Sequence, residues 1–142
     1  MAVKRKAPPK KRSIRSLAIK NGYRSGLEDT VSNQISSKGF KVRYEDEKIP
    51  YTIPSSKHTY TPDFILPNGI VIETKGRFLP DDRKKQLLIK AQHPDRDIRF
   101  VFSSSNTKIT KGSKTSYADW CIKNGFLYAD KLIPNEWFYE NK

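Results

Sequence analysis

The chain contains few of the residues that build redox and zinc sites. Only one of its 142 residues, Cys121, is a cysteine, and only two are histidines. A single cysteine cannot form an internal disulfide, and a zinc site made of cysteine and histidine side chains would lack ligands. We therefore expect Cys121 to be a buried residue of a helix without a redox role.

Long apolar runs are also missing. No segment approaches the roughly 20 apolar residues that span a bilayer, and the basic N-terminal segment lacks the apolar stretch of about 7–15 residues that follows in a signal peptide. We predict no membrane partner and no secretion, so the protein should act in the compartment where it is made. A chain of 142 residues fits a single domain that buries roughly two thirds of its unfolded surface.

Acidic residues are scarce relative to basic ones. The sequence has 28 Lys and Arg against 15 Asp and Glu, a formal net charge of +13. This excess favours a polyanionic partner, and nucleic acid more than an acidic membrane surface. Residues 1–24 hold nine of the basic side chains and no acid. We predict a flexible basic arm that orders along a phosphate backbone, although a localisation signal or a solvated tail has the same composition.

The remaining residues, 25–142, have the pattern of an α/β domain with a mixed central β-sheet flanked by helices. A capping box of the form S-x-x-E begins at Ser25, and apolar residues then recur at helical spacing until Gly39. The alternating stretch "FKVRYE", residues 40–45, predicts a strand. Prolines make "KIPYTIPSS", residues 48–56, an edge strand or a bridge. Further patterns predict a helix over 81–93, a buried strand over 97–102, a helix over 117–123 and a short turn or helix after Pro134.

The stretch "YTPDFILPNGIVIETKGR", residues 60–77, predicts an apolar hairpin that is interrupted by Asp63, Glu73 and Lys75. A two-residue turn would place the two acids on opposite faces of the hairpin. A three-residue loop, with Pro67 opening a type I turn and Gly69 left-handed, pairs Asp63 with Glu73 instead. We favour this loop because proline is preferred at that position of the turn. The Cβ atoms of the two acids would then lie about 4.5–5.5 Å apart, with Lys75 on the same face.

Two carboxylates this close repel each other, and one takes up a proton unless a cation intervenes. Lys75 supplies one positive charge, and a divalent metal is the second route, because carboxylate, phosphate and water oxygens suit Mg²⁺. The alternative is a structural ion pair of Lys75 on a solvated sheet face. The apolar neighbours weigh against it, because they indicate a hairpin deep in the domain; we place on the opposite face Phe64, Leu66 and Val71, with Ile65 and Ile72 at the ends.

Glu28 has two interpretations. As the third residue of the first helical turn it can act as the acid of the capping box that begins at Ser25. As a third carboxylate near Asp63 and Glu73 it would allow a second metal about 3.5–4 Å from the first.

The order Pro62-Asp63, then Glu73-x-Lys75, is the nuclease pattern PD-x(n)-E-x-K. With "RSGLED", "HTYTPDF", "LPNGI", "ETKG", "DDRKK", "DIRFVFSSS" and "ADKLIP", the chain resembles the phage endonuclease I family, Holliday-junction resolvases of the PD-(D/E)xK superfamily, from about residue 24 to 137. The resemblance implies a restriction-endonuclease-like core over residues 25–142. It also implies a catalytic set of Glu28, Asp63, Glu73 and Lys75.

The resemblance further implies up to two Mg²⁺ ions per site, for which Mn²⁺ can substitute. One would be held by Asp63, Glu73 and the backbone carbonyl of Thr74, the other between Glu28 and Asp63. It implies an intertwined, domain-swapped homodimer bridged by residues 46–56, in which each site takes Glu28 from one chain and the other catalytic residues from its partner. Such an enzyme would cut branched DNA symmetrically in the cytoplasm of a bacterial host.

Two rival functions remain open at this stage: a less selective nuclease of duplex or mismatched DNA, and a basic architectural DNA-binding protein without catalysis. Recognition of a junction by its shape would depend on phosphate contacts and not on base readout. The candidate DNA-binding residues are Arg24, Lys57, His58, Arg77, Lys108 and Lys111.

Overall fold

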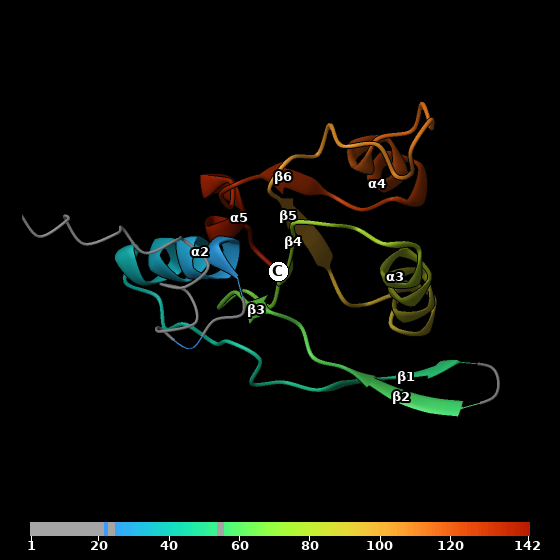
Figure 1. The fold of residues 1–142 in the computed structure, drawn as a ribbon. Helices are drawn as coiled ribbons and strands as arrows, with labels where there is room; N and C mark the ends of the chain where they lie inside the picture. Colours follow the sequence, from blue (N-terminus) through green and yellow to red (C-terminus); the bar gives the residue numbers. More distant parts are fainter. Residues whose placement is uncertain (1–21, 23–24, 54–55) are drawn as a thin grey trace, which may run out of the picture.

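The computed structural model describes residue 22, residues 25–53 and residues 56–142 (Figure 1). The predicted basic arm, residues 1–24, therefore lies almost entirely outside the described residues. In chain order the elements are α2 (Gly26–Ser37), β1 (Ile49–Ile53), β2 (Ser56–Tyr60), β3 (Phe64–Ile65), β4 (Val71–Lys75), α3 (Pro80–Gln92), β5 (Ile98–Phe102), α4 (Tyr117–Asn124), β6 (Tyr128–Asp130) and α5 (Asn135–Tyr139).

The central sheet has four strands in the order β3-β4-β5-β6. Strand β3 is antiparallel to β4, whereas β4, β5 and β6 are parallel. Helices α2 and α5 lie on one face of this sheet, and α3 and α4 lie on the other (Figure 1). The predicted α/β class with a mixed sheet and flanking helices is thus confirmed.

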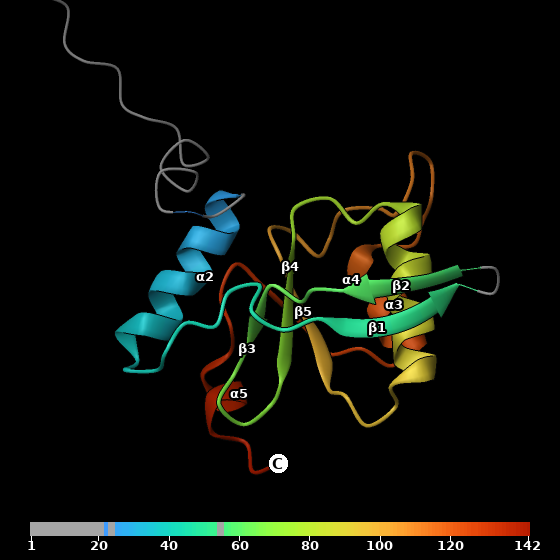
Figure 2. The same cartoon turned by 90° about the horizontal axis from the view of Figure 1, so that it is seen from below.

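Strands β1 and β2 form a separate two-stranded antiparallel sheet that packs beside α3 (Figure 2). The side-chain amide of Gln92 bonds both the N–H and the carbonyl of Thr52, at 2.6 Å each, and so ties the end of α3 to β1. As the prolines indicate, this segment stays outside the central sheet.

Apolar clusters cover both faces of the central sheet. The first contains Phe78, Phe100 and Trp120 with residues of β1, β2, α3 and α4. The second packs residues of α2 and α5 against Phe64 and Ile72. Val71 and its pairing partner Ile65 belong to the first cluster, on the face of Glu73, so their predicted placement on the opposite face is wrong. All five residues of β5 are buried, because a strand covered on both sides has no solvent face.

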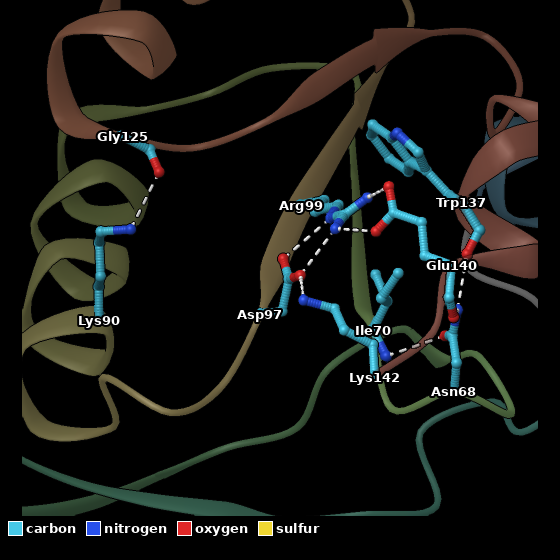
Figure 3. Close-up of polar contacts among 9 residues, drawn as sticks. All are labelled: Asn68, Ile70, Lys90, Asp97, Arg99, Gly125, Trp137, Glu140 and Lys142. Carbon is cyan, nitrogen blue, oxygen red and sulfur yellow. Dashed lines mark hydrogen bonds and ion pairs between the residues drawn. The ribbon is translucent and has the colours of Figure 1, made fainter.

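The β3–β4 connection is the predicted three-residue loop. The Leu66 N–H donates to the Ile70 carbonyl at 2.8 Å, and Gly69 has a φ of +89°, which a residue with a Cβ rarely adopts. The side chain of Asn68 holds the loop (Figure 3): its amide donates to the carbonyls of Trp137 at 2.8 Å and Glu140 at 3.1 Å. Contacts with α5 and the residue after it therefore anchor the loop, whose register is set by the turn itself.

A cluster of opposite charges lies near this loop (Figure 3). The Arg99 guanidinium on β5, only 3% exposed, donates to Asp97 at 2.7 and 2.9 Å and to Glu140 at 2.5 and 3.1 Å. Lys142 forms a further ion pair with Asp97. We call these four residues the Arg99 cluster. It connects the C-terminal segment to the central sheet.

The sequence prediction fails at residues 40–45, which form no strand. Only Tyr44 makes an isolated bridge to Phe64, because β3 is two residues long and Glu45 turns away with a φ of +49°. Phe40 and Val42 nevertheless pack their apolar sides on the second cluster, which explains the alternation. Strand β6 was not predicted, whereas the helices α2, α3 and α4 were.

The lone cysteine and the helix lengths bear on two further predictions, a packing role for Cys121 and the lack of a membrane span. Cys121 is fully buried on α4, and burial raises the pKa of its thiol to about 12, in keeping with a packing role. None of the helices in the described ranges is both long and apolar enough to cross a membrane.

Candidate active site

One cleft of about 420 Å³ collects residues from distant parts of the chain. Its lining residues are Glu28, Glu45, Thr59, Tyr60, Thr61, Asp63, Glu73, Thr74, Lys75 and Lys85. We call it the acidic cleft, because four of these residues are acids and two are lysines. All four predicted catalytic residues line it, although they come from α2, the hairpin and the segment before it.

The hairpin places Asp63 and Glu73 opposite each other. Strand pairing of Phe64 with Ile72 and of Ile65 with Val71 extends by one step to the two acids. Thr74 donates both its N–H, at 2.9 Å, and its hydroxyl, at 2.7 Å, to Oδ2 of Asp63. Thr74 thus fixes the carboxylate in position, while the predicted role of its carbonyl as a metal ligand stays a prediction.

Glu73 lies on β4 with both carboxylate oxygens engaged. The hydroxyl of Tyr60 donates to Oε2 at 2.5 Å, and the Lys75 ammonium lies 3.8 Å from Oε1. Lys75 also lies 3.3 Å from Oδ1 of Asp82, an acid in the first turn of α3. Sequence reasoning had not given Lys75 this second partner. Its ammonium is therefore held between the strand acid and the start of the helix.

Burial shifts the titration of this pair strongly. It raises the pKa of Asp63 to about 6, while hydrogen bonds from Thr74 oppose the shift and Glu28 adds to it. Burial, and next the repulsion from Asp63, raise the pKa of Glu73 to about 8 despite the opposing effect of Lys75. The same burial raises the pKa of Tyr60 well above its usual value, so its phenol remains a donor. One lysine does not compensate two buried carboxylates.

Glu28 lines the cleft and is not the acid of a capping box, because only the Ser25 half of that box is formed. Its N–H donates to the Ser25 hydroxyl at 3.1 Å, which makes Ser25 the N-cap of α2. Its carboxylate, however, accepts a hydrogen bond from the hydroxyl of Tyr44 and lines the cleft. The Ser25 hydroxyl caps the helix at the Glu28 N–H, while the buried side chain of Glu28 belongs to the cleft.

The arrangement of the acids fits a divalent metal. Carboxylate oxygens of Glu28, Glu45 and Asp63 lie within 4.8 Å of one another. Oxygen ligands at such spacing suit Mg²⁺, and a bound cation would favour the ionised form of the buried acids. Glu45 was not predicted: it reaches the site because its N–H donates to the Asp63 carbonyl at 3.1 Å in a left-handed conformation. The pattern of residues around it gives no signal for that conformation.

Five of the six predicted DNA contacts lie outside the acidic cleft. Lys57 and His58 are exposed on β2, Arg77 is exposed between β4 and α3, and Lys108 and Lys111 are exposed in the loop before α4. Arg24 is outside the described residues. None of the observations tests these contacts, which stay predictions. Sequence reasoning missed Tyr60 and Lys85, which line the cleft, and Tyr44, which donates to the Glu28 carboxylate.

Comparisons with known proteins identify the family of this chain. The sequence model of the family described as Phage endonuclease I matches residues 10–142. The chain is 64% identical to Endonuclease I of Escherichia phage T7 over 120 residues, which are 84% of this chain and 80% of the relative. It is 66% identical to Endodeoxyribonuclease 1 of Enterobacteria phage T3 over 112 residues, 79% of this chain and 74% of the relative. The chain therefore belongs to the phage endonuclease I family.

Proposed function

We propose that this protein is a metal-dependent endodeoxyribonuclease that resolves four-way DNA junctions and other branched DNA by symmetric phosphodiester hydrolysis. The observation that carries the proposal is the pairing of Asp63 with Glu73 beside Lys75 in one acidic cleft. A net charge of +13 suits a DNA substrate, and the names of the two relatives describe nucleases.

Three residues around the paired acids have separate roles in this reaction. Thr74 holds one oxygen of Asp63, and Tyr60 holds one oxygen of Glu73, so both carboxylates keep fixed orientations. Lys75 offers its ammonium to the attacking water or to the charge that develops on the phosphate oxygens. Glu73 is only 7% exposed, and the lower dielectric of its surroundings strengthens its interaction with Lys75.

The proposed metal sites use the acids of the cleft as ligands. We propose Mg²⁺, replaceable by Mn²⁺, at Asp63, Glu73 and the Thr74 carbonyl, and a second ion between Glu28 and Asp63; the cluster of Glu28, Glu45 and Asp63 supports the second position. When bound, the metal would polarise the phosphodiester, lower the pKa of a coordinated water and stabilise the leaving oxygen.

The proposal is tested with a four-way junction and a sequence-matched linear duplex, each with Mg²⁺ or with EDTA. We expect paired cuts in the junction with Mg²⁺ only. Equal cutting of both DNAs would point to a less selective nuclease, and binding without cutting would point to an architectural protein. The Glu73→Gln variant should lose the cleavage activity of the wild type. Unchanged cleavage by that variant would contradict the assignment of the site.

We also propose that the active protein is an intertwined, domain-swapped homodimer with a restriction-endonuclease-like core. Two symmetric cuts require two sites at a fixed spacing, which a two-fold dimer supplies. The separation of the β1–β2 sheet from the central sheet supports an exchange through residues 46–56, since an exchanged segment recreates the same contacts between chains.

A mixed dimer tests the exchange. If Glu28 and Glu73 of one site come from different chains, a dimer of one Glu28→Gln chain and one Glu73→Gln chain contains one intact site. That dimer should nick the junction on one strand, although each pure variant is inactive. An inactive mixed dimer would mean that each site is built from a single chain.

A further inference from the structure

Lys85 is a lysine of the acidic cleft to which the chemistry above assigns no role. It lies half-buried on α3, and its ammonium is 5.3 Å from the ring centre of Tyr60 and 5.7 Å from that of Tyr51. Both distances are within the roughly 6 Å over which a cation is attracted to an aromatic face. Two tyrosines from the β1–β2 sheet therefore hold this ammonium at the wall of the cleft.

The two cleft lysines differ in their partners. Lys75 is paired with Glu73 and Asp82. Within the ranges that the structure describes, no carboxylate forms an ion pair with Lys85, and no hydrogen bond involves its ammonium. Aromatic faces attract an ammonium without neutralising its charge, and its N–H donors remain able to bind an anion. Lys85 is thus a positioned positive charge that suits an anionic ligand.

The position of Lys85 relative to the reacting groups is set by Tyr60. The ring of this tyrosine contacts the Lys85 ammonium, while its hydroxyl donates to Glu73 at 2.5 Å. Glu73 and Lys85 therefore contact the hydroxyl and the ring of one tyrosine, and both line the acidic cleft. Four acids line the cleft, so a phosphate needs a nearby cation of the protein besides any metal.

We propose that Lys85 binds a backbone phosphate of the DNA strand that enters the acidic cleft. The inference rests on the proposed function and adds a substrate-binding residue to the site. The contact is made in the bound complex before reaction, so it acts on affinity more than on the chemical step.

The test measures DNA binding in EDTA, where the strand is not cut, as a function of salt. Lys85→Met keeps the apolar stem over the tyrosines and removes the charge. We expect it to weaken junction binding on the order of tenfold at low salt. The slope of log affinity against log salt should become shallower by about 0.9, the value for one lost phosphate contact. Lys85→Arg should restore both quantities.

Lys84→Met is the matched control, because Lys84 is the exposed neighbour on α3 and lies outside the acidic cleft. It removes the same charge and should leave the slope unchanged. Equal binding by Lys85→Met and the wild type, or equal losses in the Lys84 and Lys85 variants, would overturn the proposal. Thermal unfolding of each variant checks folding, and Lys85→Gln replaces the Met variant should that one unfold.

A chemical change in the DNA gives an independent readout. Replacing single phosphates of the junction by neutral methylphosphonates should identify one position that weakens wild-type binding and has no further effect in Lys85→Met. Additive losses at every position would contradict the contact. The proposed function fails separately, if the wild-type protein neither binds nor cuts the junction with Mg²⁺.

Discussion

The molecule has two polar clusters on neighbouring strands of one sheet, and their charges are arranged in opposite ways. The Arg99 cluster has two acids and two bases, and its main hydrogen bonds run between them. Hydrogen bonds from Arg99 lower the pKa of Asp97 to about 2. In the acidic cleft four acids face two lysines, and the pKa values of Asp63 and Glu73 are raised to about 6 and about 8.

This difference indicates that the Arg99 cluster stabilises the fold and that the acidic cleft is a functional site. A balanced cluster satisfies its own groups and holds two segments together. An unbalanced cluster of buried acids costs stability unless an external cation enters, and groups with perturbed pKa values in a cleft are typical of functional sites. The two clusters therefore predict opposite responses to substitution, to pH and to metal.

The largest effect should come from removing a charge in the acidic cleft. We expect Glu73→Gln to lower the rate of junction cleavage on the order of 10³-fold, because one of the two paired carboxylates is lost. Glu140→Gln is the isosteric control, since it removes an acid of the Arg99 cluster away from the cleft. Single-turnover cleavage of the junction measures both. Similar losses in the two variants would remove the functional distinction between the clusters.

The next largest effect is the loss of protein stability when the Arg99 cluster is disrupted. Arg99→Met leaves Asp97 and Glu140 facing each other without the guanidinium, and we expect the free energy of unfolding to fall by about 3 kcal/mol. Urea denaturation measures this change. Lys142→Met, whose side chain is 39% exposed, should have a much smaller effect. An equal loss in both variants would mean that burial of Arg99 is not the decisive feature.

A substitution in the acidic cleft should raise the free energy of unfolding, whereas Arg99→Met lowers it. The folded pKa of Glu73 lies above its ordinary value of 4.5, so the associated stability is present at low pH and is lost as pH rises through about 8. Without metal, Glu73→Gln should therefore raise the free energy of unfolding by about 2 kcal/mol near neutral pH. Denaturation measured from acid to alkaline pH should show a flatter profile for the variant. A loss of stability at alkaline pH relative to the wild type would contradict the raised pKa.

The pH response of the Arg99 cluster provides the contrast. The folded pKa of Asp97, about 2, lies below its ordinary value of 3.8, so its contribution is present above that value and is lost as pH falls toward 2. Asp97→Asn should lower the free energy of unfolding by a constant amount above the ordinary pKa of 3.8, so part of the acid-side loss disappears and the slope on the alkaline side stays unchanged. Denaturation profiles of this variant and of Glu73→Gln should differ at opposite ends of the pH range.

The smallest effect concerns the loop that fixes the register of the acids. Asn68→Ala removes the hydrogen bonds to the carbonyls of Trp137 and Glu140. We expect a loss of about 1 kcal/mol in unfolding free energy and a slower cleavage through a less fixed hairpin. Asn106→Ala, in an exposed loop, is the control. A stable Asn68→Ala variant would show that Pro67 and Gly69 alone determine the turn.

The register of the hairpin could be predicted from the sequence because it depends on local chemistry. Pro67 favours the start of a type I turn and Gly69 accepts a positive φ, so three adjacent residues decide which acids face each other. Helices α3 and α4 were predictable for a similar reason, since their first turns and caps are encoded within a few residues.

The rest of the cleft could not be predicted, because it depends on how separate elements pack. Lys85 and Tyr60 meet only because the β1–β2 sheet lies against α3, and Glu45 enters through a left-handed backbone that an alternating pattern does not reveal. The partners of Arg99 come from the loop before β5 and from the end of the chain. An arginine in an apolar strand gives no sign of which distant acids will satisfy it.

Proton release on metal binding tests the central claim, that the acids of the cleft form a metal site and give up a proton when a divalent cation binds. Calorimetric titration of the wild-type protein with Mg²⁺ near neutral pH, in two buffers of different ionisation enthalpy, measures the protons released. Because the pKa of Glu73 is about 8 and that of Asp63 about 6, we expect release of about one proton per site, absent in Glu73→Gln. Metal binding without proton release, or the same release in the variant, would contradict the account.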